Sequence, residues 1–239
     1  LLPLVARLAA AGGRTQARRP RGLILAPTRE LVNQIDAALA PLAKSAGLRT
    51  LTVYGGVKPG PQVQALGRGV DIVVACPGRL EDHLRSGNVD LSAVAVTVLD
   101  EADHMADLGF LPGVKRILDK TPRGGQRLLF SATLDAGVDV LVRRYLDSPV
   151  VHSVDTAQSP VSSMTHHVLH VDRNGRLDVI TDLAAAPGRT VLFTRTKRGA
   201  KVLARQLNQR GVPAVELHGN LSQGARTRAL DAFSSGKAT

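Results

Sequence analysis

The first part of the chain alternates short apolar runs with longer segments in which apolar residues recur every three or four positions. Short apolar runs are typical of strands with both faces buried, and the longer pattern is typical of helices with one apolar face. The predicted strands are Leu23–Ala26, Thr50–Tyr54, Asp71–Ala75, Val94–Leu99, Arg127–Phe130 and Val150–Val154. The predicted helices are Arg29–Ser45, Gln62–Gly67, Arg79–Arg85, Gly113–Asp119 and Ala136–Leu146. This alternation predicts an α/β fold in which helices flank a mainly parallel sheet.

A polar stretch interrupts this alternation. Residues 155–163 (DTAQSPVSS) have no periodicity, which predicts a linker. The alternation then resumes, with strands predicted at Val168–Val171, Val191–Thr194 and Ala214–Leu217, and helices at Arg173–Ala186, Lys197–Arg210 and Ser222–Ser234. We therefore expect two domains, at residues 1–154 and 164–239, of which the second is small for a complete α/β domain.

The charge of the chain indicates the kind of partner. Lysine and arginine give a formal net charge of +11, which favours binding to polyanions, nucleic acid first and an anionic membrane second. Aromatic residues make up only 3% and there is no tryptophan, so bases are not expected to stack on aromatic platforms. We expect contacts to phosphate and sugar instead.

The composition also bears on location. No apolar run approaches the roughly 18 to 20 residues of a membrane-spanning helix, so a membrane is not expected as a partner. Residues 1–10 are apolar, but no basic segment precedes them, which argues against a signal peptide. The single cysteine, Cys76, cannot form an internal disulfide and fits a reducing compartment. A cytoplasmic location is therefore the expectation.

The strongest local signal is VAVTVLDEAD at residues 94–103, where an apolar strand ends in carboxylates. Ligands of open α/β sheets bind at the carboxyl ends of the strands. Asp100 is well placed there to hold Mg²⁺ directly or through water, and Glu101 to orient or deprotonate an attacking water. Asp103 follows closely. The alternative is an ordinary acidic helix start, which the helix dipole stabilises without any catalytic role.

Other polar and glycine-rich groups follow the other predicted strands. Because the carboxyl ends of parallel strands share one edge, these groups should lie together around the acidic cluster. Glycine lets a backbone approach phosphate closely, helix N-termini offer N–H donors, and arginine pairs with phosphate oxygens. The groups are Pro27, Thr28, Arg29 and Glu30, then Gly55 and Gly56, then Pro77, Gly78 and Arg79, and finally Ser131 and Thr133.

In their order and identity these motifs resemble the DEAD-box ATP-dependent RNA helicases of superfamily 2. The resemblance runs along nearly the whole chain. In the first domain, residues 27–31 (PTREL) are similar to motif Ia, Gly55-Gly56 to the GG motif, residues 77–79 to motif Ib, residues 100–103 to motif II and residues 131–133 to motif III. In the second, residues 191–196 (VLFTRT) are similar to motif IV and residues 223–226 (QGAR) to the QxxR element.

This resemblance implies two RecA-like domains that close around ATP and single-stranded RNA. Asp100 and Glu101 would serve Mg²⁺ and water activation, while Ser131 and Thr133 would couple nucleotide state to RNA binding through hydrogen bonds to Asp103. The motif Ia, GG and Ib residues would bind the RNA backbone, with little sequence preference. In the second domain, the residues that would bind the RNA backbone are Thr194, Arg195, Thr196, Gln223 and Arg226.

The chain departs from the family pattern in one major way. No G-x-x-x-x-G-K-[ST] sequence occurs in its 239 residues. Relative to the family, the Q motif and P-loop would lie before residue 1, and motifs V and VI after residue 239. The P-loop amides and lysine hold the β- and γ-phosphates. We therefore expect a fragment that binds ATP poorly and hydrolyses it negligibly.

Alternatives remain open for the function and for two smaller features. A non-catalytic RNA-binding or chaperone module could use the basic surface without hydrolysis, and a DNA-directed superfamily 2 motor is a third hypothesis. His166, His167 and His170 invite a metal site, but no cysteine or acidic ligand completes a zinc pattern, so a solvated strand face is favoured. Cys76 stands where the family more often has threonine, which weakens one expected RNA contact.

Overall fold

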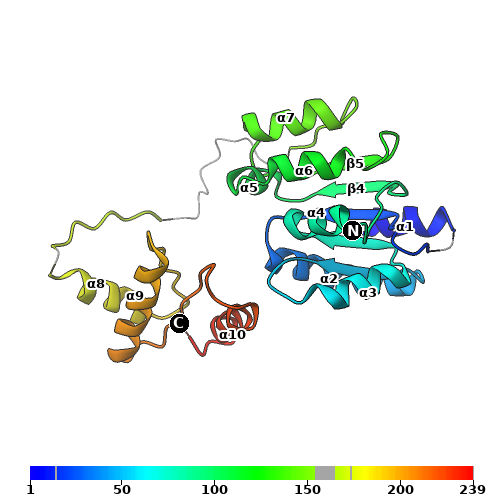
Figure 1. Cartoon of the computed structure of the whole chain (residues 1–239). Helices are drawn as coiled ribbons and strands as arrows, with labels where there is room; N and C mark the ends of the chain where they lie inside the picture. Colours follow the sequence, from blue (N-terminus) through cyan, green and yellow to red (C-terminus); the bar gives the residue numbers. More distant parts are fainter. Residues whose placement is uncertain (14, 154–164, 173, 239) are drawn as a thin grey trace. The chain divides into compact units, whose positions relative to one another are not determined.

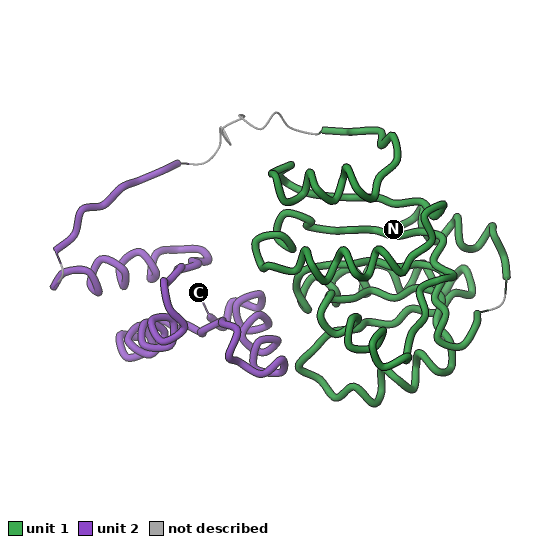
Figure 2. The backbone as a smooth tube through the Cα atoms, turned by 45° about the horizontal axis from the view of Figure 1, so that its top comes forward, with its two compact units in different colours: residues 1–159 green, residues 160–239 purple. Residues whose placement is uncertain are grey.

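We describe a computed structural model of the chain, covering residues 1–13, 15–153, 165–172 and 174–238. The chain divides into two compact units, residues 1–159 and 160–239 (Figure 2). We describe each unit by itself. The predicted linker at 155–163 falls outside the described residues, so this linker and the domain limits built on it stay predictions. Among the described residues, no helix is both long enough and apolar enough to cross a bilayer.

Unit 1 contains a five-stranded sheet in the order β2-β3-β1-β4-β5, and every neighbouring pair is parallel (Figure 1). Parallel strands need crossover connections, and helices supply them here. The strands are β1 (Gly22–Leu25), β2 (Thr50–Val53), β3 (Ile72–Ala75), β4 (Val96–Leu99) and β5 (Gln126–Leu129). The predicted α/β fold with a parallel sheet is confirmed, and these five strands lie within two residues of their predicted limits.

Alternating residues of the strands build two separate cores. Leu23 and Leu25 of β1 pack into one core, whereas Ile24 packs into the other. Because successive side chains of a strand point to opposite faces, both faces of the sheet must be covered. Helices α1 and α2 cover the Ile24 face, and helices α3 to α7 contribute buried residues to the other.

Most helices of unit 1 begin where the sequence provides a cap or a proline. The Thr28 hydroxyl accepts a hydrogen bond from the Leu31 amide at 3.2 Å, and the Asp135 carboxylate accepts one from the Val138 amide at 2.9 Å. Proline in the first turn starts several of the others. The helices are α1 (Leu2–Ala10), α2 (Arg29–Ser45), α3 (Pro59–Arg68), α4 (Pro77–Arg85), α5 (Ala102–Asp107), α6 (Leu111–Leu118) and α7 (Ala136–Tyr145).

Unit 2 contains the three helices α8 (Arg176–Ala185), α9 (Lys197–Gln209) and α10 (Gln223–Ser234), close to their predicted limits. A small core forms around Ala184, Leu207 and Val212. The described residues of this unit contain no strand.

Four predicted strands are therefore wrong over their described residues: Val150–Val154, Val168–Val171, Val191–Thr194 and Ala214–Leu217. An apolar run becomes a strand only when a neighbouring strand completes its hydrogen-bond ladder, and these segments have no such partner among the described residues. Their side chains are correspondingly open, with Val168 99% and Phe193 95% exposed.

Candidate functional site

The site is built on the carboxyl edge of the unit 1 sheet. The last residues of the five strands are in register: Leu25 pairs with both Ala75 and Leu99, Val53 with Ala75, and Leu99 with Leu129. The segments that leave the strands therefore start level with one another. We call these segments the rim; they are residues 26–30, 54–57, 76–79, 100–103 and 130–133. The rim contains all the site residues predicted for the first domain, the carboxylates included.

The acidic cluster begins directly after β4. The Asp100 amide donates to the Leu25 carbonyl at 2.9 Å, which extends the ladder to the rim. Glu101 then takes a left-handed backbone conformation with φ 49° and ψ 56°. A non-glycine residue in this region is strained, and such strain is concentrated at functional sites. The turn leaves the Glu101 side chain exposed, with its Oε2 3.2 Å from His104 Nδ1.

Asp100 has the properties expected of a cation ligand. Burial raises the pKa of its carboxyl group, and the neighbouring charge of Glu101 raises it further, although the hydrogen bond from the Glu101 amide opposes them. Across the described part of the chain, no lysine or arginine forms an ion pair with Asp100. A divalent cation would supply the missing positive charge, and Mg²⁺ is commonly held by one or two carboxylates together with substrate phosphates. The donor set at this position therefore fits Mg²⁺.

Asp103 is joined to the rim segment after β5. The Asp103 Oδ2 accepts hydrogen bonds from the Thr133 amide at 3.0 Å and the Thr133 hydroxyl at 3.1 Å. The Ser131 hydroxyl accepts from the Asp103 amide at 3.2 Å and donates to the Thr133 carbonyl at 2.6 Å. Burial acts to raise the pKa of Asp103, but the hydrogen bonds outweigh it and the pKa is lowered. The hydrogen bonds expected from Ser131 and Thr133 to Asp103 are thus present, whereas their catalytic role stays a prediction.

A glycine turn after β2 lies against the arginine that begins α2. Gly56 has φ 78°, and a Cβ atom built on it would lie 2.1 Å from Nη1 of Arg29. The left-handed backbone conformation favours glycine, and any side chain at this position would displace the guanidinium. On the far side of the turn, Arg79 Nη1 donates to the Val57 carbonyl at 3.2 Å. The structure therefore brings together Arg29, Gly56 and Arg79, each from a different predicted RNA-binding motif.

Cys76 precedes α4 and is half-buried. Burial is the main cause that raises the pKa of its thiol, to about 12. A thiol with this pKa stays protonated at physiological pH and is a poor nucleophile. We assign Cys76 no catalytic role.

The predicted RNA-binding residues of unit 2 lie at the starts of two helices. The Thr196 hydroxyl caps α9 by accepting from the Gly199 amide at 3.0 Å, and Thr194 Oγ1 donates to the Thr196 carbonyl at 3.0 Å. Gln223 and Arg226 lie in the first turn of α10, which the Ser222 hydroxyl caps. Helix N-termini with free amides are suitable for phosphate. The geometry is compatible with the predicted role, which stays a prediction.

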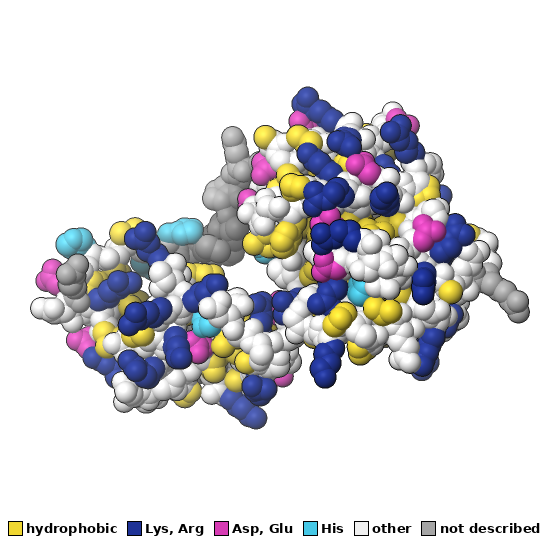
Figure 3. Space-filling model, in the orientation of Figure 1, with side chains coloured by type: hydrophobic (Ala, Val, Ile, Leu, Met, Phe, Trp, Pro, Cys, Tyr) yellow, Lys and Arg dark blue, Asp and Glu magenta, His cyan; other side chains and the backbone are white. Residues whose placement is uncertain are grey.

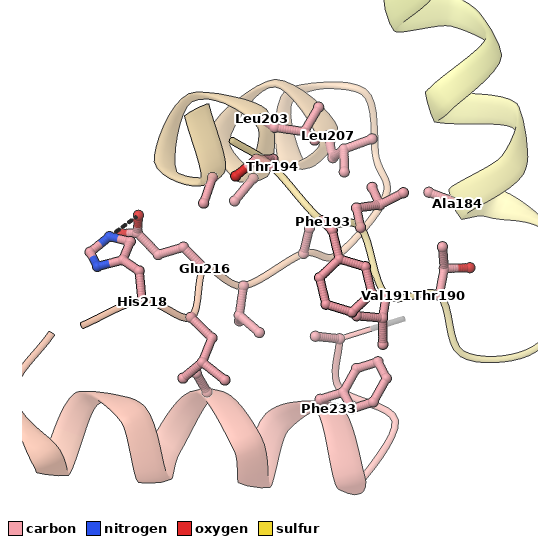
Figure 4. Close-up of a pocket in the computed structure, with 18 of the residues that line it drawn as sticks. Ala184, Thr190, Val191, Phe193, Thr194, Leu203, Leu207, Glu216, His218 and Phe233 are labelled. Atoms are coloured by element: carbon pink, nitrogen blue, oxygen red, sulfur yellow. Dashed lines mark hydrogen bonds and ion pairs between the residues drawn. The ribbon is translucent and has the colours of Figure 1, made fainter. Parts of the chain in front are cut away.

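Between these helices, unit 2 encloses a largely apolar cavity of about 490 Å³ (Figure 4). Its walls include the unpaired apolar segment around Val191 and Phe193, together with Leu203, Leu207 and Phe233. At one end, His218 Nε2 lies 3.2 Å from Glu216 Oε2. The cavity lies where the side chains of the unpaired segments have no neighbouring strand to pack against.

On the face of each unit that Figure 3 draws, the charged side chains are scattered rather than gathered in one patch. In the face drawn in Figure 3, lysine and arginine side chains alternate with neutral groups and with a smaller number of carboxylates. His166, His167 and His170 are exposed. The described ranges contain no group of three or more histidine, cysteine, aspartate or glutamate residues arranged to hold a metal ion. The strand predicted to carry these histidines is absent from the described residues, so the prediction of a solvated strand face is only correct in that the side chains are exposed.

Sequence reasoning missed three residues near the rim. His104 contacts Glu101, while Gln62 and His83 are buried polar side chains below the glycine turn. Gln62 and His83 carried a usable signal, because a polar residue within the apolar pattern of a helix needs a partner. The identity of that partner depends on tertiary packing.

A buried parallel sheet whose carboxyl edge carries acidic, Ser-Ala-Thr and arginine–glycine segments defines a class of α/β proteins that bind their ligands at this edge. The family comparison is consistent with this class. Residues 1–141 match the family model of the DEAD/DEAH box helicases, and residues 173–239 match the model of the helicase conserved C-terminal domain. The chain belongs to the DEAD-box RNA helicase family.

Sequence similarity to known relatives extends along almost the whole chain. A maize protein, DEAD-box ATP-dependent RNA helicase 3B, chloroplastic, is 39% identical over 229 residues, which are 94% of this chain and 30% of the relative. DEAD-box ATP-dependent RNA helicase 30 of Arabidopsis thaliana is 37% identical over 241 residues, covering 99% of this chain and 41% of the relative. The chain thus spans well under half the length of these relatives. The maize name includes "chloroplastic", so the comparisons do not support the predicted cytoplasmic location.

A solved structure supports the fold. The DEAD box protein of the hyperthermophile Methanococcus jannaschii is 30% identical and superimposes with a TM-score of 0.55 over 98% of this chain and 64% of that one. The predicted RecA-like fold class is confirmed by this similarity.

Proposed function

We propose that the protein containing these residues is an RNA-dependent ATPase that unwinds or remodels short RNA duplexes locally. ATP binding would close the two RecA-like domains on the backbone of one RNA strand and displace its partner. The observation that carries this proposal is the hydrogen-bonded link between Asp103 and the Ser131–Thr133 segment. This link connects the acidic cluster with the neighbouring rim segment, so a movement of the acidic cluster would also move that segment.

The roles of the acidic residues follow from their positions. Asp100, half-buried and without an ion-pair partner among the described residues, would hold Mg²⁺ directly or through water. When bound, this ion would neutralise charge on the phosphates of ATP. Glu101 is exposed beside it and would orient the attacking water and accept its proton. Asp103 would keep the Ser131–Thr133 segment in place.

The RNA partner would be bound through its backbone. The residues Gly55 and Gly56 add no side chains of their own to the turn, and the guanidinium of Arg29 beside Gly56 contributes positive charge. Contacts to phosphate and sugar give little sequence preference, and discrimination against DNA would come from the 2′-hydroxyl groups. We further propose that the 239-residue polypeptide binds ATP weakly by itself, since its sequence lacks the P-loop lysine. A cytoplasmic location also remains a proposal.

A direct test compares two polypeptides. RNA-stimulated ATP hydrolysis is measured for the full-length protein encoded by the gene and for the 239-residue chain, each with RNA and with DNA of the same sequence. We expect RNA to stimulate the full-length protein strongly, DNA to stimulate it weakly, and the 239-residue chain to be inactive. Robust turnover by the short chain contradicts its proposed deficiency. RNA binding by a full-length protein that never hydrolyses ATP favours the non-catalytic module instead.

A further inference from the structure

Two buried polar side chains below the rim have no part in the proposed chemistry. Gln62 of α3 is 6% exposed and His83 of α4 is 2% exposed. Gln62 Nε2 donates to the Tyr54 carbonyl at 3.0 Å, and Gln62 Oε1 lies 3.0 Å from His83 Nε2. Burying two such groups is unfavourable unless their hydrogen bonds are made, and here they are made to each other and to the backbone.

The donor and the acceptor of each hydrogen bond follow from the bond that Gln62 makes to the backbone. Because Gln62 uses its amide nitrogen on Tyr54, its oxygen must accept, and His83 Nε2 therefore carries a proton. His83 Nδ1 then accepts from Asn88 Nδ2, 3.4 Å away. Burial is the main cause that lowers the pKa of His83, Arg79 lowers it further, and Asp82 opposes them. On helix α6, which packs against α4, Arg116 is paired with Glu81. The neutral imidazole is thus the form that the surroundings favour.

This chain of hydrogen bonds ends on the residue that precedes the glycine turn. Tyr54 is followed by Gly55 and Gly56, which have no side chains to hold them in place. The other end of the turn is held by the hydrogen bond from Arg79 to the Val57 carbonyl. Gln62 is therefore the matching anchor on the first side, and the direction of the turn amides depends on both anchors.

We propose that Gln62 and His83 are positioning residues that hold the Tyr54–Val57 turn in the conformation that binds the RNA backbone. Gln62 acts directly on the Tyr54 carbonyl, and His83 acts by fixing the orientation of the Gln62 amide. The inference rests on the proposed function, in which the Gly55–Gly56 turn contacts RNA. The inference adds that RNA binding by the turn requires two residues that do not contact RNA themselves.

The test uses an isosteric change whose hydrogen bonding depends on pH. In Gln62→Glu, an ionised carboxylate accepts from His83 but has nothing to donate to Tyr54, whereas a protonated carboxyl group replaces both functions of the amide. Burial raises the pKa of a carboxyl group, so the protonated form of the Gln62→Glu side chain becomes populated as the pH falls. Binding of a fluorescein-labelled single-stranded oligouridine RNA to the full-length protein, with a non-hydrolysable ATP analogue present, is measured by anisotropy. We expect affinity about tenfold below wild type at about pH 8 and within about threefold of it at about pH 6.

Two further variants separate positioning from general destabilisation. Gln62→Met keeps the side-chain length, buries no charge and should weaken RNA binding by about tenfold at both pH values. Thr121→Val removes a buried hydroxyl at the opposite edge of the sheet, where Thr121 Oγ1 donates to the Leu118 carbonyl at 2.8 Å, and should leave RNA affinity unchanged. Urea unfolding of all three variants reports their stability.

Each outcome is decisive. Loss of affinity in both Gln62 variants, recovery of Gln62→Glu at the lower pH and normal binding by Thr121→Val support the inference. Affinity of Gln62→Met within twofold of wild type, or an equal loss in Thr121→Val, overturns it while the proposed function stands. A full-length wild-type protein that binds no RNA in this assay overturns RNA binding by this turn, and the inference with it.

Discussion

The two edges of the unit 1 sheet differ in how their carboxylates are paired. At the amino edge, Asp71 is 1% exposed, and its carboxylate accepts from Arg21 Nη2 and the Thr15 hydroxyl, both at 2.8 Å, and from the Arg49 amide at 2.9 Å. Burial acts to raise the pKa of Asp71, but these partners lower it. At the carboxyl edge, Asp100 has a raised pKa and Glu101 a strained backbone.

This difference indicates that the carboxylate at the amino edge contributes to stability, whereas those at the carboxyl edge are available for function. A carboxylate that is fully paired stabilises the folded state, whereas one with a raised pKa destabilises it near neutral pH. The carboxyl edge retains this unfavourable arrangement because an unpaired carboxylate is available to a ligand. Four substitutions test the contrast, from the largest expected effect to the smallest.

The largest effect is expected for Glu101→Gln in the full-length protein. The amide keeps the shape of the side chain but cannot accept a proton, so RNA-stimulated ATP hydrolysis should fall by at least about 100-fold. RNA affinity and the midpoint of thermal unfolding should stay unchanged. Hydrolysis within threefold of wild type would remove Glu101 from the mechanism.

At the amino edge, Asp71→Asn should lower the free energy of unfolding by about 3 kcal/mol, because it leaves Arg21 without its charged partner. Since the folded-state pKa of Asp71 is lowered, the advantage of wild type is present above the unfolded pKa and disappears as the pH falls through the folded pKa. Urea unfolding as a function of pH measures this. RNA affinity of the folded variant should match wild type; a selective loss of RNA binding would break the contrast between the edges.

A smaller effect is expected for Thr133→Val, which removes one hydrogen bond to Asp103 and keeps the one from the Thr133 amide. Because the site is exposed, the free energy of unfolding should fall by only about 0.5 kcal/mol. The pKa of Asp103 should move back towards its usual value, which carboxyl NMR titration detects. An unchanged Asp103 titration would show that the hydroxyl does not hold this carboxylate.

The smallest effect, and one of opposite sign, is expected for Asp100→Asn. Since the pKa of Asp100 is raised, its ionised form destabilises the folded state near neutral pH, and removing the charge should increase the midpoint of urea unfolding slightly. The gain should vanish at acidic pH, where the wild-type carboxyl group is protonated. Asp103→Asn serves as the matched control and should lower the midpoint, because its pKa is lowered. Destabilisation by both variants would contradict the assignment of Asp100 as unpaired.

The sequence was sufficient for the five strands of the unit 1 sheet because their signals are local, whereas helices α1 and α5 were not predicted from the apolar pattern and the strand predicted at Val150–Val154 is wrong over its described residues. Apolar runs such as Ile72–Ala75 are buried on both faces, and a parallel sheet then determines which edge receives the residues that follow them. The positions of Thr28, Gly56 and Asp100 at one edge could be predicted in this way. The Gln62–His83 pair could not, since it depends on how α3 and α4 meet.

Unit 2 illustrates the limit of the same reasoning. Residues 191–194 and 214–217 have the composition of strands, but a strand also requires a partner of suitable register. Without that partner, the apolar side chains of Val191 and Phe193 line a cavity or face solvent. The helices of this unit were easier to predict, because Thr196 and Ser222 provide caps within the helical segment itself.

The level ends of the five strands restrict how this domain can change over evolution. An inserted residue within β1 would advance Thr28 by about 3.3 Å relative to its neighbours and would also exchange the side chains that face the two cores. Either consequence alone would be damaging, so length variation among relatives should be confined to the connections at the amino edge and to helix ends. Strand length is therefore the property that keeps the rim segments level with one another.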